Sequence, residues 1–114
     1  MNEELMNQAM AIILHAGDAR TYCEDALNEI ALFQFQKAEE KLAICEEYLV
    51  KAHTIHTKIV QREAGGETFE YMMLFAHAQD TLMTIASEIR MTKKLYKMYQ
   101  GLDQRFAQLE TKCR

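Results

Sequence analysis

Apolar residues in the middle of the chain recur at alternating intervals of three and four positions. This spacing is typical of a helix that buries one face against near-parallel or antiparallel neighbours. The opposite face carries lysine and glutamate, as a solvated face should. The pattern therefore predicts a helix that begins near residue 35 and ends near residue 63. Its buried positions are Phe35, Ala38, Leu42, Cys45, Leu49, Ala52, His56 and Ile59.

A second apolar series follows Ala64-Gly65-Gly66-Glu67, the clearest break in the chain. We expect this long helix to begin near Thr68, whose hydroxyl can cap it, and to stop at Gly101. Residues 102–114 are expected to form a helical extension or a loose tail. The buried positions of this helix are Phe75, Ala78, Leu82, Ile85, Ile89, Thr92, Tyr96 and Tyr99.

The first helix carries two apolar stripes, which suggests two neighbours. One stripe is Ile12, Ala16, Ala19, Cys23, Ala26, Ile30 and Phe33, and the other is Met6, Met10, Ile13 and Gly17. Glycine within a helix costs about 1 kcal/mol relative to alanine, which is tolerable where another backbone approaches closely. A turn is placed at residues 32–36, because one helix through residue 63 would be unusually long.

Together these patterns predict an all-α fold, an antiparallel up-down-up three-helix bundle that forms one domain over residues 1–114. The composition agrees, because the chain has no proline and only four glycines. Such a chain has few places to turn, which favours a few long helices over many short strands. Extra apolar surface on the third helix indicates self-association.

Charge and cysteine content exclude several classes of function. A net charge of −4 disfavours nucleic acid and membrane surfaces as partners, and no apolar run approaches the length of a membrane span. Three widely spaced cysteines predict neither a disulfide framework nor a zinc site, so the reducing cytoplasm is the expected compartment. We expect Cys23 and Cys45 to be packing residues and Cys113 to be exposed.

His77 is the strongest candidate for chemistry. Steps of three and four from it reach Asp80, Thr81, Thr84 and Ser87, a polar stripe beside the apolar seam of the third helix. The stripe holds short side chains and no lysine or arginine, unlike the solvated faces elsewhere. Because neutral imidazole is a good nucleophile near neutral pH, a functional histidine is a reasonable interpretation. A solvent-facing polar stripe is the simpler alternative.

The other histidines are better explained as structural residues. His53 and His56 are three positions apart and could bind a metal, but no third ligand lies near them in sequence. His15 is expected to be a partly buried structural residue. No phosphate-binding glycine loop, metalloprotease motif or nucleophile elbow is present.

Three segments resemble the lactose/cellobiose-type IIA components of the bacterial phosphoenolpyruvate-dependent sugar phosphotransferase system. The segment from His77 to Thr84, His-Ala-Gln-Asp-Thr-Leu-Met-Thr, is similar to the active-site signature of that family. The segments Ala16–Arg20 and Lys37–Leu42 also match, and the similarity covers about residues 5–100. Three matching segments in the right order make a chance resemblance unlikely.

The resemblance implies a three-helix bundle that trimerises into a nine-helix assembly. It implies that the carrier protein HPr donates a phosphoryl group to His77, which passes it to a cysteine of a IIB partner. The sugar is then phosphorylated as it enters through a membrane IIC component. The resemblance further implies that Asp80 binds a divalent metal, usually Mg²⁺, on the trimer axis. We interpret Asp80 as an assembly residue and not as an acid–base catalyst, because three buried carboxylates repel one another without a cation.

With a helix start near Thr68, His77 would lie about two turns in, too far for the free N–H groups of the first turn to hold a phosphate. Donors would then come from neighbouring side chains, another subunit or the partner. Gln79 is a weak candidate, because a residue two positions on points away from His77.

The chain departs from the family at three places. Thr81 replaces a second histidine found in many members, Gln34-Phe35-Gln36 replaces a turn that commonly has Gly and Asp, and the tail beyond Gly101 is longer than expected.

Two alternative functions remain: a histidine phosphotransfer domain, whose usual His-x-Leu-Lys-Gly context is missing, and a non-catalytic helical adaptor. The imported β-linked disaccharide is not encoded in any feature of this chain.

Overall fold

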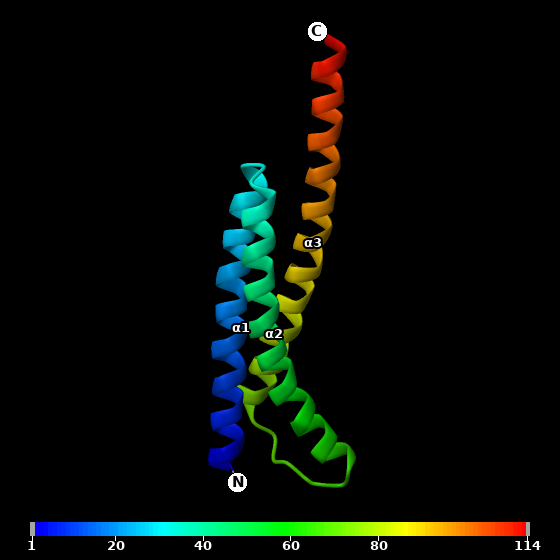
Figure 1. The fold of residues 1–114 in the computed structure, drawn as a ribbon. Coiled ribbons are helices and arrows are strands. Elements are labelled where there is room, and N and C mark those ends of the chain that lie inside the picture. Colours follow the sequence, from blue (N-terminus) through cyan, green and yellow to red (C-terminus); the bar gives the residue numbers. More distant parts are fainter. Residues whose placement is uncertain (1, 114) are drawn as a thin grey trace.

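The chain folds into three α-helices, which run up, down and up (Figure 1). The computed structural model describes residues 2–113, so Met1 and Arg114 lie outside the described residues. The helices are α1 (Asn2–Ala31), α2 (Phe35–Ala64) and α3 (Met73–Cys113), and residues 2–113 contain no strand. The predicted all-α antiparallel three-helix bundle is confirmed.

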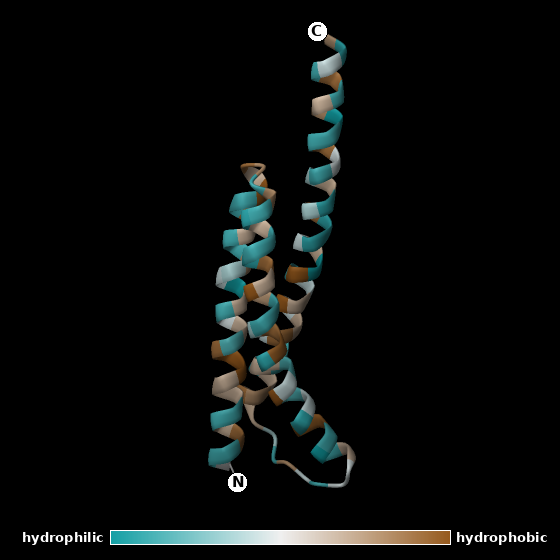
Figure 2. Ribbon diagram, in the orientation of Figure 1, coloured by the Kyte–Doolittle hydropathy of each residue, from teal (hydrophilic) through white to brown (hydrophobic). Residues whose placement is uncertain are grey.

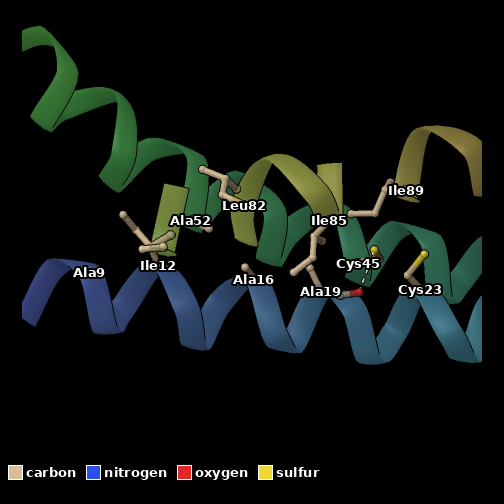
Figure 3. Close-up of a cluster of buried hydrophobic side chains, with 11 residues drawn as sticks. Ala9, Ile12, Ala16, Ala19, Cys23, Cys45, Ala52, Leu82, Ile85 and Ile89 are labelled. Carbon is tan, nitrogen blue, oxygen red and sulfur yellow. Dashed lines mark hydrogen bonds between the residues drawn. The ribbon is translucent and has the colours of Figure 1, made fainter. Parts of the chain in front are cut away.

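The core lies where the predicted apolar seams of the three helices meet (Figure 3). Alanines on α1 allow close approach of the neighbouring helices, while larger aliphatic side chains of α3 fill the space between them. Cys23 and Cys45 are buried in this core and Cys113 is exposed, as expected. The core cluster comprises Ala9, Ile12, Ala16, Ala19, Cys23, Cys45, Ala52, Ala78, Leu82, Ile85 and Ile89.

The turn between α1 and α2 falls where it was predicted, although it contains no glycine. Phe33 takes the left-handed conformation, with φ of 60°, which is uncommon for a residue with a side chain. Backbone hydrogen bonds hold this turn, among them Gln34 N–H to the Glu29 carbonyl at 2.9 Å. The Phe33 ring also packs edge-on against Phe35 and Tyr99. Aromatic packing and backbone bonding thus offset the local strain.

The connection between α2 and α3 is longer than predicted, because α3 begins at Met73 and not near Thr68. Gly66, with φ of 106°, redirects the chain after α2. The Arg62 guanidinium then holds the connection by hydrogen bonds to Glu67 at 3.0 and 2.5 Å and lies over the Phe69 ring at 5.0 Å. These contacts keep the segment around Thr68 outside the helix.

The predicted stop of α3 at Gly101 is also wrong, because the helix continues to Cys113. Glycine weakens a helix but ends it only where the chain must change direction, and the residues after Gly101 are mostly good helix formers. Figure 1 shows α3 extending well beyond the turn that joins α1 and α2. All residues from 102 to 113 are exposed, and the molecule measures 69 × 21 × 19 Å.

Apolar residues of α1 and α3 form two exposed stripes, and Figure 2 shows how apolar and polar residues are distributed along the helices. On α1, Met6 and Met10 of the second predicted stripe are exposed, and a Cβ added at Gly17 would meet no atom of another helix within 4 Å. The close backbone approach that we expected at Gly17 is therefore absent from residues 2–113. The exposed apolar residues of α3 include Met91, Met98, Leu102, Phe106 and Leu109.

None of the helices in residues 2–113 is both long enough and apolar enough to span a membrane.

Candidate functional site

His77 is exposed on the outer surface of α3, as the fifth residue of that helix. Because α3 begins at Met73, His77 lies about one turn from the helix start, and the expectation of two turns is wrong. Side chains in a helix tilt toward its N-terminus, so the imidazole leans toward the first turn. The free N–H groups of that turn and the helix dipole favour negative charge there. A phosphoryl group on His77 would benefit from this field.

The polar stripe around His77 is largely exposed, and its hydroxyl groups are used within the helix. Thr81 donates to the His77 carbonyl at 2.8 Å, and Thr84 donates to the Asp80 carbonyl at 2.7 Å. Within residues 2–113, neither the His77 ring nor the Asp80 carboxylate has a hydrogen bond or an ion pair. Both side chains are therefore available to a ligand or a partner.

Gln79 lies on the other side of α3, as its two-residue offset from His77 predicted. Its Oε1 lies 2.8 Å from Nε2 of the buried His56 on α2. The His56 ring also stacks on Phe75 of α3, with centroids 6.0 Å apart and planes at 14°. Sequence reasoning placed His56 on the seam of α2 but missed this contact, because the pairing depends on how two distant helices are aligned.

The remaining histidines behave as structural residues. His53 is exposed and its Nδ1 lies 3.2 Å from the Thr57 hydroxyl. The ring of the half-buried His15 stacks on Tyr48 at 6.4 Å, and its Nδ1 is buried without a hydrogen-bond partner. No cluster of three or more metal-ligating side chains occurs in the described part of the chain.

Asp80 by itself cannot satisfy a divalent cation. Mg²⁺ and Ca²⁺ take about six or more oxygen ligands, and one exposed carboxylate supplies at most two. Its chemistry fits a hard cation only if copies of the chain bring several carboxylates together and water fills the remaining positions. The metal interpretation of Asp80 therefore depends on assembly.

A cavity of about 310 Å³ lies between the end of α2, the connection to α3 and the first turns of α3. Phe75 and Gln79 line it, but His77 does not, so the cavity is separate from the exposed histidine. The full lining is Leu5, Ile59, Val60, Glu63, Phe69, Glu70, Tyr71, Met72, Phe75, Ala76 and Gln79.

Known proteins share both the sequence pattern and the fold. Residues 7–100 match the family of the lactose/cellobiose-specific IIA subunit of the phosphotransferase system (PTS). The chain therefore belongs to the PTS lactose/cellobiose-specific IIA family.

Individual relatives cover almost the whole chain. It is 36% identical to the lichenan-specific phosphotransferase enzyme IIA component of Bacillus subtilis, over 90% of this chain and 93% of that protein. It is 33% identical to the lactose-specific EIIA component of Lacticaseibacillus casei, over 96% and 95% of the two chains. The crystal structure of PtcA from S. mutans superposes with a TM-score of 0.86 at 31% identity, covering 88% of this chain and 98% of that one.

Proposed function

We propose that this chain is a phosphocarrier that accepts a phosphoryl group from phospho-HPr on His77 and passes it to a cysteine of a IIB partner. The chain belongs to a family of phosphotransferase components, and this reaction is the finer role that we assign to it. The exposed His77 imidazole, without a partner and one turn into α3, is the observation that carries the proposal. The transfers accompany uptake of a β-linked disaccharide through a membrane IIC component.

The chemistry follows from the properties of imidazole. A neutral ring nitrogen of His77 attacks the phosphorus, and the bond from phosphorus to the donor histidine breaks, with the electron pair leaving on the donor ring. The proton on the other nitrogen of His77 passes to solvent while the departing imidazole regains one. Such a transfer needs in-line placement and stabilised oxygens more than covalent help. The resulting phosphoramidate is labile enough to be passed to a thiolate.

The N-terminus of α3 stabilises a negative phosphoryl group on His77, whereas the Asp80 carboxylate repels it. The helix dipole is worth roughly 0.3–1 kcal/mol to an anion near the first turn. The Asp80 carboxylate, one turn further along the same face, would repel phosphohistidine if it stayed free. We therefore assign Asp80 to assembly, with Mg²⁺ or another divalent cation held by several copies. When bound, such a cation neutralises the clustered carboxylates.

A homotrimer forming a nine-helix assembly accounts for the exposed apolar stripes. Met91, Met98, Leu102 and Leu109 continue the face of α3 that carries Asp80 and Thr84, at helical spacing. An identical stripe on another copy covers such a face and brings the Asp80 side chains together. Trimerisation thus gives Asp80 the neighbours that a single chain lacks.

The expected setting is the cytoplasm, where HPr and the IIB component are found. Two relatives named above are lichenan-specific and lactose-specific components, and both of these carbohydrates contain β-linked sugars, which supports the proposed substrate class. The discrimination between such sugars is assigned to the IIC partner, because His77 handles only the phosphoryl group.

The choice of phosphoryl donor tests this function. The chain is incubated with radiolabelled phosphoenolpyruvate, enzyme I and HPr, and in parallel with an autophosphorylated sensor histidine kinase. We expect label only with HPr, and transfer of that label to IIB when IIB is added. Labelling by the kinase alone would instead support a histidine phosphotransfer domain. Absence of label from both donors would support a non-catalytic adaptor.

A further inference from the structure

His56 is a buried polar residue for which the phosphoryl-transfer chemistry has no direct use. It is one of only two buried polar residues in the described chain, with 9% of its surface exposed. The core cluster around it is built of alanine, cysteine and aliphatic side chains. A polar ring in such a place needs a hydrogen-bond partner, and Gln79 provides it at 2.8 Å. The position is therefore built around a specific polar contact between α2 and α3.

Both contacts of His56 fall on the first two turns of α3. Phe75 and Gln79 are four positions apart, so they lie one above the other on the same face of the helix. The ring of His56 stacks on Phe75 while its Nε2 meets Gln79. His77 stands between these two residues in sequence and points to the outer side. One α2 side chain thus contacts the helix two positions before and two positions after the phosphate-accepting residue.

The inner side of this part of α3 meets the core through Leu74, Phe75 and Ala78, but a cavity remains beside it. The cavity of about 310 Å³ lies beneath it, and Phe75 and Gln79 form part of the cavity wall. Tyr71 in the connection before α3 and Met73, the first residue of the helix, are exposed, at 83% and 75%. Helix ends fray when packing does not fix them. The His56 contacts are therefore well placed to stop the first turns of α3 from moving into the cavity.

We propose that His56 is a positioning residue that clamps the first two turns of α3 and so fixes the direction of the His77 imidazole. With Nε2 protonated, it donates to Gln79 Oε1, and the stacked Phe75 ring completes the clamp. The inference rests on the proposed phosphoryl transfer at His77. In-line transfer is sensitive to placement, and a shift of about 1 Å can cost on the order of 100-fold in rate.

Two substitutions at residue 56 separate positioning from simple stability. His56→Leu fills the position with an apolar side chain and removes the hydrogen bond, whereas His56→Gln retains a donor for Gln79. His53→Leu is the matched control, because His53 lies one turn away on α2, is exposed, and forms a side-chain hydrogen bond only with Thr57 within residues 2–113. Ile89→Val is the control for stability, because Ile89 is buried in the core far along α3.

The experiment measures kcat and KM for phosphoryl transfer from phospho-HPr, together with amide hydrogen exchange across residues 73–79. For His56→Leu we expect kcat to fall about tenfold with KM changed by less than about twofold, because the nucleophile is misplaced while docking is retained. Exchange in residues 73–79 should become faster. His56→Gln should recover most of kcat, and His53→Leu should match the wild type.

The inference is overturned if His56→Leu transfers phosphate at the wild-type rate. It is also overturned if Ile89→Val, at an equal loss of melting temperature, lowers kcat by the same factor. If wild-type protein accepts no phosphate, the proposed function fails, and the role of His56 is then tested by hydrogen exchange alone. Faster exchange confined to residues 73–79 in His56→Leu would support the role of His56 in fixing these turns, and unchanged exchange would contradict it.

Discussion

At the scale of single residues, burial controls the reactivity of the cysteines. The Cys45 thiol is fully buried and lies 3.1 Å from the Ala19 carbonyl, to which it donates. The neighbouring Cys23 thiol and burial raise the pKa of Cys45 above the ordinary value of 9.0. Cys113 is exposed near the end of α3. The three thiols should therefore differ strongly in reactivity.

We predict that iodoacetamide labels Cys113 first in the native protein and Cys45 only on unfolding. Because the folded pKa of Cys45 lies above its unfolded value, its contribution to stability is complete below about pH 9 and is lost as the pH rises further. The free energy of unfolding, measured in urea from about pH 8 to about pH 10, should thus fall less steeply in Cys45→Ala. Equal slopes would show that ionisation of this thiol does not matter.

Candidate-site residues that share one helical face could be identified from sequence, whereas contacts between different helices could not. His77 and Asp80 stand out because they lie on one helical face with short polar neighbours, a pattern that depends only on local periodicity. The contact of His56 with Gln79 depends on the alignment of α2 against α3 across a connection of eight residues. No local pattern fixes that alignment.

At the scale of helices, the core seams were predictable while the helix ends were not. The seams repeat many times, so one irregular position does not hide them. The start of α3 depends on the conformation of the connection before it, which the contacts of Arg62 with Glu67 and Phe69 and the positive φ of Gly66 hold. The end of α3 was missed because Gly101 resembles a stop signal although the chain does not turn there. The start of the helix matters for the chemistry, because a helix that begins at Met73 places His77 one turn from its N-terminus.

Two glycines of different geometry provide a test at this scale. Gly17 lies within α1, where an added Cβ meets no other helix, so Gly17→Ala should raise the free energy of unfolding by about 1 kcal/mol. Gly66 has φ of 106°, so Gly66→Ala should lower it by about 1 kcal/mol or more. Urea denaturation at matched protein concentration measures both. Destabilisation by Gly17→Ala would show that another chain packs against α1 there.

At the scale of the whole molecule, the surface contains apolar area that one chain does not cover. Three separate observations point to self-association: the exposed methionines of α1, the stripe on α3 and the lone carboxylate of Asp80. The extension of residues 102–113 carries two acidic and two basic residues, so it has no net charge to repel an identical copy. The trimer in the proposed function is consistent with all three.

We predict that Leu102→Lys weakens the proposed trimer, because it places a charge in the apolar stripe of α3. Light scattering after size-exclusion chromatography should show a shift toward monomer at micromolar concentration. Gln104→Lys adds the same charge on another side of the helix and should leave the mass unchanged. Equal behaviour of the two variants would mean that the stripe is not an interface.

The role of Asp80 is tested by removing both the charge and the metal. If Asp80 serves assembly, EDTA should weaken the wild-type trimer because three carboxylates then repel one another. Asp80→Leu should form a trimer that resists EDTA and should still accept phosphate. An Asp80→Leu protein that remained trimeric but accepted no phosphate would instead give Asp80 a part in the chemistry.

The central claim, that His77 carries the phosphoryl group, is tested most directly by intact-mass spectrometry. The protein is incubated with enzyme I, HPr and phosphoenolpyruvate and analysed at neutral or mildly alkaline pH, where phosphohistidine survives. The account predicts one added phosphoryl group per wild-type chain, which acid removes, and none on folded His77→Ala. A wild-type chain that gains no phosphate in the presence of active HPr, or a His77→Ala chain that still gains one, would contradict it.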